Sequence, residues 1–307
     1  MDQNLIKLST EQPNPNTTDI DLYSTDKVLQ AISDEDVTVA YAVRKELKDI
    51  TALTEEYIQT IETGHRVFYV GCGTSGRLAY IDAAELIPTY CIAEDVVIPI
   101  MAGGLPAMRK AKEHAEDIAE NGSKDVKEQG FTKNDFLIGI AASGRTPYVV
   151  DAINYAKSLG AKTGCIVCNK NTQMGALVDY PIEIEVGPEV VRGSTRMKSA
   201  TAQKLTLNMI STTVFVRLGG SYKNLLMNGK ATTYKAEQRH IRAIVSEAGI
   251  SEEKAIALLN ECDGDPKPAL FMAFTNASKE EADKVIKAHH NRLREAINDY
   301  QIAVTNK

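Results

Sequence analysis

The sequence predicts an α/β fold, a three-layer α-β-α sandwich around a doubly wound parallel sheet. From residue 66 onward, short apolar runs alternate with helix-like stretches, as in parallel sheets whose strands are buried on both faces. Small, hydroxyl-bearing residues follow the first and third runs, at the strand ends where such sheets bind ligands. The expected strands are Val67–Val70, Val96–Ile100, Phe136–Ala141, Thr163–Cys168 and Ile182–Val186.

Helices are expected before, between and after these strands. Polar residues 1–23 look like an arm, and residues 24–64 like two helices, with capping residues for the second at 33–36. Between the strands we expect helices near residues 75–84, 105–119 and 146–159, the first of them ended by Pro88. Residues 195–218 should form one long helix, stopped by Gly219 and Gly220.

The last part of the chain shows only a helical pattern. From Thr232 onward, short amphipathic pieces are separated near residues 249, 264–266 and 276–278. This pattern fits a small three-helix, UBA-like module and a simple helical cap equally well. We therefore expect three parts: residues 1–64 as arm and packing helices, 65–230 as the main α/β domain, and 231–307 as a helical module.

Composition limits the class of protein. The 307 residues are 43% hydrophobic and 25% charged, which is typical of a globular protein. A net charge of −6 argues against a partner that is a nucleic acid or a membrane surface. The first residues show no targeting pattern and no apolar run could span a bilayer, so we expect a cytoplasmic protein with free thiols. The cysteines are Cys72, Cys91, Cys165, Cys168 and Cys262.

Three related loops predict an anion site. Each places hydroxyl-bearing and small residues at the start of a helix, where free backbone N–H groups and the helix dipole favour an anion. Because two of them follow strands of one sheet, they should form a single phosphate cradle. The loops are Ser75-Gly76-Arg77, Ser143-Gly144-Arg145 and Gly193-Ser194-Thr195-Arg196.

Other chemistries fit less well. Residues 71–76 match G-x-G-x-x-G, but the acidic residue that would bind a dinucleotide ribose is missing, since Glu94 and Asp95 precede the second strand. Cys165 and Cys168 lie within an apolar strand, where two buried thiols are expected rather than a redox pair. The five histidines form no zinc pattern and no G-x-S-x-G elbow is present, so we expect no metal and no cofactor.

Three longer segments contain these loops and carry a resemblance to a known family. Residues 71–77, 141–148 and 186–198 resemble the N-acetylmuramic acid 6-phosphate etherases, which have a sugar isomerase (SIS) fold. The likeness extends to the arm at residues 10–21, the long helix at 201–205 and the helical tail. It implies that residues 65–230 are a SIS phosphosugar-binding domain.

The resemblance also implies a reaction and a site. The family cleaves the D-lactyl ether of N-acetylmuramic acid 6-phosphate by elimination and then addition of water, with Glu85 as proton donor and Glu116 as base. Spacing alone would not select these two glutamates. The phosphate is expected among Thr74, Ser75, Gly76, Arg77, Ser143, Gly144, Arg145, Thr146, Ser194 and Thr195, and further pocket candidates are Glu189, Arg196 and Lys198.

Two other functions are considered beside the etherase. One is a non-catalytic phosphosugar sensor, like the glucokinase regulatory protein, and the other is a sugar-phosphate isomerase. Retention of both glutamates argues against the sensor, and residues 193–198 favour the etherase over the isomerase. SIS proteins commonly pair, so we expect a homodimer in which a second chain helps to complete the site.

Overall fold

The computed structural model describes residues 8–231 and 233–305, so the first seven residues of the expected arm lie outside it, as do Thr232, Asn306 and Lys307. The chain forms two compact units. One comprises the residues up to Glu85 together with Ala93–Ser211, and the other comprises Leu86–Ile92 with Thr212 and the residues after it.

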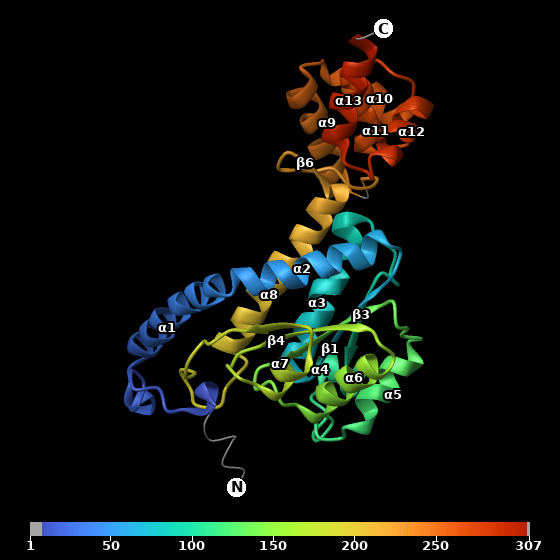
Figure 1. Ribbon diagram of the computed structural model, residues 1–307. Helices are drawn as coiled ribbons and strands as arrows, with labels where there is room; N and C mark the ends of the chain where they lie inside the picture. The colour runs from blue at the N-terminus through green and yellow to red at the C-terminus, as the bar shows by residue number, and fades with distance from the viewer. Residues whose placement is uncertain (1–7, 232, 306–307) are drawn as a thin grey trace. The chain divides into compact units, whose positions relative to one another are not determined.

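The first unit contains a five-stranded parallel sheet with the order β2-β1-β3-β4-β5 (Figure 1). In register, Gly71 at the end of β1 pairs with Met101 on one side and Ile140 on the other. The predicted α/β fold with a doubly wound parallel sheet is therefore confirmed. The strands are β1 (Val67–Gly71), β2 (Val97–Met101), β3 (Phe136–Ala141), β4 (Lys162–Val167) and β5 (Tyr180–Glu183).

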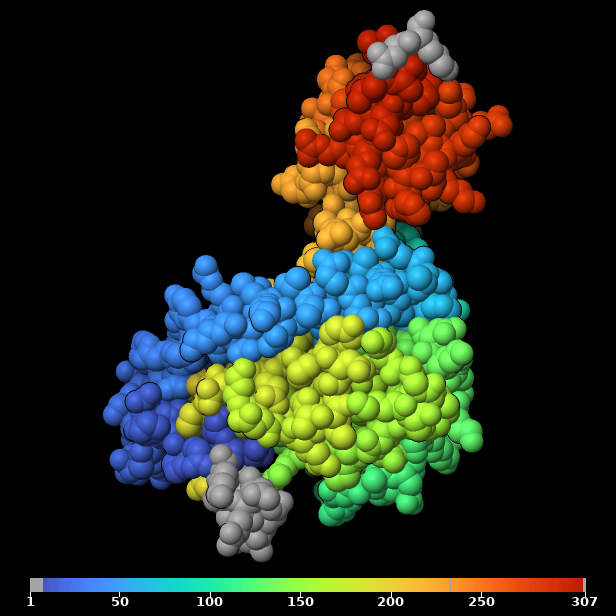
Figure 2. Space-filling view, viewed as in Figure 1, coloured from blue at the N-terminus to red at the C-terminus, as the bar shows by residue number. Residues whose placement is uncertain are grey.

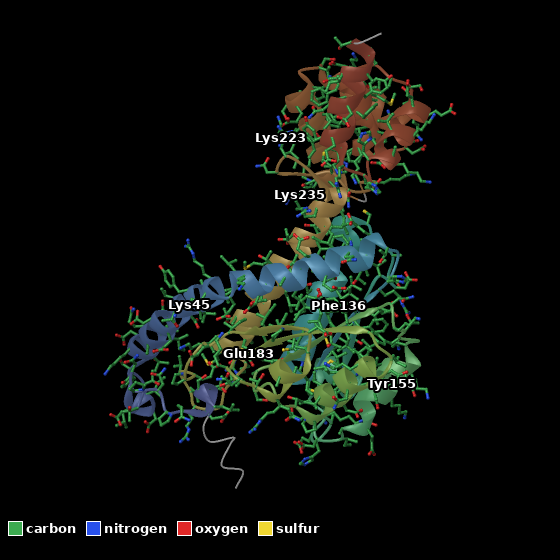
Figure 3. The ribbon with its side chains drawn as sticks, in the orientation of Figure 1. Lys45, Phe136, Tyr155, Glu183, Lys223 and Lys235 are labelled. Carbon is green, nitrogen blue, oxygen red and sulfur yellow. The ribbon has the colours of Figure 1, made fainter. Side chains whose placement is uncertain are left out.

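Helices cover both faces of this sheet. Because side chains alternate along a strand, Phe68 and Val70 join the apolar core beneath α5 (Glu120–Glu128) and α6 (Pro147–Ser158). Tyr69 points to the other face, toward α2 (Leu47–Glu62), α3 (Gly73–Tyr90) and α8 (Lys198–Phe215). Phe136, labelled in Figure 3, is fully buried in β3. The short helices are α4 (Pro106–Arg109) and α7 (Gln173–Leu177).

The predicted start of the second helix is wrong. Residues 33–36 lie inside α1 (Thr25–Lys45), and α2 begins only at Leu47. The buried residues of α1 are Glu35, Val39, Ala42 and Val43, and half-buried Val28, Ala31 and Ile32 extend the same helical stripe across the expected break. Burial of that stripe outweighs the capping tendency of a Ser-Asp-Glu-Asp sequence.

Two further helix boundaries differ from the prediction. Pro88 does not end α3, which continues to Tyr90 with the proline in its last turn. The helix expected at residues 105–119 is divided into α4 and α5, with an irregular loop between them. His114 has φ +58° in this loop, a left-handed backbone conformation that interrupts a right-handed α-helix.

The second unit is helical apart from a short hairpin, β6 (Ser221–Tyr222) and β7 (Leu225–Leu226). From Tyr234 onward its described part holds five helices rather than three, and serine, threonine or aspartate side chains cap four of them. They are α9 (Tyr234–Ala248), α10 (Glu252–Glu261), α11 (Pro266–Thr275), α12 (Lys279–Ala288) and α13 (Leu293–Thr305). Over residues 8–231 and 233–305, no helix is long and apolar enough to cross a bilayer.

Candidate active site

A cavity of about 400 Å³ opens beyond the carboxyl ends of β1 and β3, the two strands between which the chain changes direction across the sheet. Ligands bind at this point in doubly wound folds. The walls come from the arm, the loops after β1 and β3, the loop after α4 and the segment before α8. The lining residues are Glu11, Cys72, Gly73, Thr74, Ser75, Glu116, Asp117, Ile140, Ala141, Ala142, Ser143, Arg145, Thr146, Pro147 and Thr195.

The loop after β1 brings the start of α3 to the cavity. A Cβ on Gly71 would lie 2.8 Å from the backbone N of Gly76, and a Cβ on Gly76 would lie 2.7 Å from Cβ of Met101. Glycine therefore lets the strand and the helix meet closely. Gly76 packs against β2 and does not line the cavity, whereas Thr74 and Ser75 do. Their backbone N–H groups belong to the first turn of α3, which favours an anion.

A hydrogen bond to a residue of α8 fixes the side chain of Ser75. Its hydroxyl donates a hydrogen bond of 2.8 Å to Oε1 of Gln203, whose side chain is 1% exposed. Among the residues that the structure describes, Nε2 of Gln203 has no partner. The role of Gln203 was not predicted, because a glutamine within a long helix carries no sequence signal of what it faces.

The loop after β3 supplies the second helix N-terminus. Gly144 has φ +69°, its carbonyl accepts a 2.9 Å bond from Met174 N, and a Cβ there would lie 2.5 Å from Cβ of Thr172. Glu183, labelled in Figure 3, fixes Thr172 in turn. Its Oε1 accepts hydrogen bonds of 2.7 Å from the backbone N and from Oγ1 of Thr172. The loop is thus shaped by its contacts with the segment after β4. Ser143, Arg145 and Thr146 line the cavity, and Thr146 is the N-cap residue of α6.

The segment before α8 contributes only Thr195 to the lining. Ser194 and Arg196, its neighbours, lie outside the lining set. Glu189 is fully buried and accepts hydrogen bonds from Lys198 N and Ser199 N at 2.9 and 3.0 Å, so it caps α8.

Lys198 is also buried away from the cavity. Its Nζ lies 2.6 Å from Oε2 of Glu35 and donates to the carbonyl of Pro188 at 3.2 Å. Burial alone would raise the pKa of Glu35, but hydrogen bonds from Asn16 and Lys198 outweigh it and lower that pKa. In this chain, Glu189 and Lys198 therefore hold the start of α8 in place rather than line the pocket.

Glu116 lies in the loop between α4 and α5, not late in a helix as predicted. Its carbonyl accepts a hydrogen bond from Tyr148 N at 3.2 Å, which ties the loop to the start of α6. It lines both the main cavity and an adjoining cavity of about 250 Å³. Arg77 lines only the second cavity, and its guanidinium donates to the carbonyls of Ala107 and Met108.

Cys72 lies between the same two cavities. Burial, together with the negative charge of Glu116, raises the pKa of the Cys72 thiol to about 12. The thiol is therefore neutral near pH 7 and is a poor nucleophile there.

Glu85 does not meet Glu116 within this chain. It follows Gly73 by twelve residues on α3, and a rise of 1.5 Å per residue carries it about 18 Å from the cavity end of that helix. Its side chain is exposed, and it lies outside the lining of the main cavity. The structure thus brings Glu116 together with the hydroxyl-bearing loops and leaves Glu85 apart.

Two family models match parts of this chain. A model of the SIS domain matches residues 119–213, and a model of the glucokinase regulatory protein N-terminal SIS domain matches residues 49–157. Among solved structures, a phosphoheptose isomerase from Francisella tularensis aligns with a TM-score of 0.48 and 15% identity, covering 64% of this chain and 100% of that chain.

Curated relatives align over almost the whole chain. An N-acetylmuramic acid 6-phosphate etherase from Clostridium beijerinckii is 45% identical, covering 91% of this chain and 92% of that protein. Another from Geobacillus sp. is 42% identical, and the alignment covers 95% of this chain and 99% of that protein. The fold and these matches define a protein with a SIS domain. Within that class, the chain belongs to the N-acetylmuramic acid 6-phosphate etherase family, which are carbon–oxygen lyases.

Proposed function

We propose that this protein cleaves the D-lactyl ether of N-acetylmuramic acid 6-phosphate, giving N-acetylglucosamine 6-phosphate and D-lactate. One observation carries the proposal: a single cavity combines the Glu116 carboxylate with hydroxyls and two helix N-termini suited to a phosphate. Relatives that bear this name match nearly the full chain. We place the reaction in the cytoplasm, in the recycling of cell-wall amino sugars.

The phosphate binds at the starts of α3 and α6. Ser143 and Thr195 present hydroxyls there, whereas the Ser75 hydroxyl already donates to Gln203, and the first N–H groups of both helices add donors and positive potential. Arg145, which lines the same cavity, adds a positive charge to this attraction. The attraction explains how a chain with a net charge of −6 can bind an anionic sugar.

The two glutamates then move protons. In the open-chain sugar, the proton on C2 is acidic because C1 is an aldehyde, and Glu116 removes it. The electron pair forms a C2–C3 double bond, the C3–O bond breaks, and Glu85 protonates the departing lactyl oxygen. Water then adds its oxygen to C3 while C2 regains a proton. The net change is addition of one water across the ether.

Because one chain keeps Glu85 and Glu116 apart, we propose a homodimer in which each cavity receives Glu85 from the other copy. Ile81, one helical turn before Glu85, is 43% exposed although it is a large apolar residue. An exposed apolar side chain beside an exposed glutamate on α3 is what a contact surface at this place requires.

The test of the reaction is release of D-lactate from N-acetylmuramic acid 6-phosphate. The wild-type protein should release it, and Glu116→Gln should lose at least about a hundredfold in turnover, the usual contribution of a general base. Tight binding of the phosphosugar without any lactate would contradict the lyase and support the sensor instead.

The contribution of Glu85 from a second copy is tested with mixed dimers. A purified dimer of Glu85→Gln with Glu116→Gln keeps one intact site of two and should have about half of the wild-type activity. A dimer of the wild-type chain with the double variant carries the same number of substitutions but no intact site, so it should be inactive. The reverse pattern would show that both glutamates act within one chain.

A further inference from the structure

The N-terminal arm brings another carboxylate into the cavity. Glu11 ends the short helix η1 (Ser9–Glu11) and lines the same cavity as Ser75 and Ser143. Its Oε2 lies 3.6 Å from the position that a Cβ on Gly193 would occupy. The carboxylate therefore rests against the backbone that leads to Thr195. The chemistry proposed above gives it no part.

The arm is fixed to the sheet by Asn169, which follows β4 and is 2% exposed. Oδ1 of Asn169 accepts hydrogen bonds from Ser9 Oγ at 2.9 Å and from Thr10 N at 3.4 Å. Its Nδ2 donates to Thr10 Oγ1 at 3.1 Å and to the carbonyl of Ala142 at 3.0 Å. One buried amide thus joins the residues before Glu11 to the cavity loop after β3.

A second set of contacts fixes the arm to the segment before α8. Nε of Arg192 donates to the carbonyl of Glu11 at 2.7 Å, and Thr17 Oγ1 donates to the carbonyl of Val190 at 2.8 Å. Figure 2 shows the dark blue arm next to the yellow atoms of this segment. The backbone at Glu11 is therefore held from both sides, as positioning of a binding residue requires.

The charge of Glu11 decides what it can contact. A carboxylate accepts hydrogen bonds and donates none, and it repels a phosphate or a second carboxylate. Within one cavity, the phosphate must then bind on the side of the helix N-termini. The group that faces Glu11 must be a neutral donor, and in a phosphosugar these donors are hydroxyl and amide N–H groups.

We infer that Glu11 is a specificity-determining residue that accepts hydrogen bonds from the sugar hydroxyls of the bound phosphosugar. This inference rests on the proposed function, because it takes the substrate to be a phosphosugar. Glu11 orients the carbon chain between the phosphate and Glu116, and it selects against substrates that carry an anion at that position.

The test compares Glu11→Gln and Glu11→Ala with Glu94→Gln, which removes the same charge from an exposed residue outside the cavity lining. Glu11→Ala should raise KM for the phosphosugar about tenfold, as expected when hydrogen bonds to a charged acceptor are lost, with kcat changed less than about threefold. Glu11→Gln should raise KM less, and Glu94→Gln should not change it. Competitive inhibition by inorganic phosphate should be unchanged in all three.

Thr10→Val tests how the arm positions Glu11. It removes one hydroxyl that contacts Asn169 and nothing in the cavity. It should raise KM in the wild-type background but add nothing to Glu11→Ala, because Thr10 acts on KM only by positioning the Glu11 carboxylate. Additive effects would overturn the positioning role of the arm.

The inference is overturned if KM of Glu11→Ala stays within about twofold of the wild type, or if inhibition by phosphate weakens in parallel with KM. Its failure is distinct from failure of the proposed function. If the wild-type protein releases no lactate, calorimetry with N-acetylglucosamine 6-phosphate and with inorganic phosphate still separates the two ligands. In that case, Glu11→Ala must weaken binding of N-acetylglucosamine 6-phosphate and leave binding of inorganic phosphate unchanged.

Discussion

The two faces of the sheet are held by different kinds of contact. Beneath α5 and α6, the packing is apolar and includes Val70, Leu137 and Ile153, all fully or almost fully buried. The opposite face is also packed with buried apolar side chains, such as Ile138 and Ile166, but hydrogen bonds between side chains run through it as well. Tyr69 Oη lies 3.3 Å from Tyr57 Oη and from Asp82 Oδ2.

Helices α3 and α8 cover this second face and begin near the cavity. Hydrogen bonds between side chains join the two helices. Ser75 donates to Gln203, and Ser211 donates to Asp82 at 3.0 Å. The bonded positions are seven residues apart on α3 and eight on α8, about two turns in each helix. Apolar packing adapts to small shifts, whereas directed bonds do not. Apolar packing on both faces thus contributes to stability, and we expect the directed bonds of the second face to set the position of the cavity walls as well.

The largest expected effect on stability comes from the apolar face. Leu137→Ala should lower the free energy of unfolding by about 2–5 kcal/mol, because it leaves a cavity in a close-packed core. Below the unfolding transition, kcat/KM should remain close to the wild-type value. Urea titration and steady-state kinetics measure the two quantities, and a large loss of kcat/KM in the folded variant would break the division between the faces.

Gln203→Met should have a smaller effect on stability and a larger one on binding. It leaves the buried hydroxyl of Ser75 without its acceptor, at a cost of about 1–3 kcal/mol. Since Ser75 lines the cavity, KM for the phosphosugar should also rise, by about threefold or more. If KM in this variant equals that of Leu137→Ala, the hydrogen-bonded face does not set the cavity walls.

The sequence predicts most of the residues in the cavity loops after β1 and β3. It does not predict the residues that contact these loops from distant parts of the chain. Strand ends, glycines and hydroxyls are local signals, so residues 74–75 and 143–146 were expected at the site with good reason. The composition around Glu116 predicts a helix, yet the segment is a loop, and the Glu116 carbonyl accepts a hydrogen bond from Tyr148 N at the start of α6.

The burial of Glu189 and Lys198 could not be read from sequence either. Glu189 caps α8, and Lys198 pairs with Glu35, which lies more than 150 residues earlier in the chain. Glu11 and Gln203 reach the cavity walls only because distant segments fold together. Such contacts depend on packing, which no local pattern records.

The pH dependence of stability provides a third test of the hydrogen-bonded face. Burial raises the pKa of Asp82 more than the bond from Ser211 and the charge of Lys204 lower it. A carboxyl whose pKa is higher in the folded state stabilises fully below its unfolded pKa, and this contribution is lost as pH rises through the folded value. Stability of the wild type should therefore fall with rising pH in that window, relative to Asp82→Asn. Parallel curves from urea titrations would contradict this role of Asp82.

The smallest effect is expected from Ser211→Ala. It removes one hydrogen bond to Asp82 two turns away from the cavity, so stability should fall by about 1 kcal/mol. KM should not change, because the bond between Ser75 and Gln203 still fixes the cavity end of both helices. A rise in KM as large as that of Gln203→Met would show that the whole contact between α3 and α8, rather than its cavity end, determines binding.

The most direct test of the central claim is the reaction run in water labelled with oxygen-18. Elimination followed by addition of water breaks the bond between C3 and the ether oxygen, so lactate keeps that oxygen. Mass spectrometry should then find D-lactate without label, and N-acetylglucosamine 6-phosphate with one labelled oxygen at C3. Label in the lactate, or no release of lactate at all, would contradict the proposed lyase.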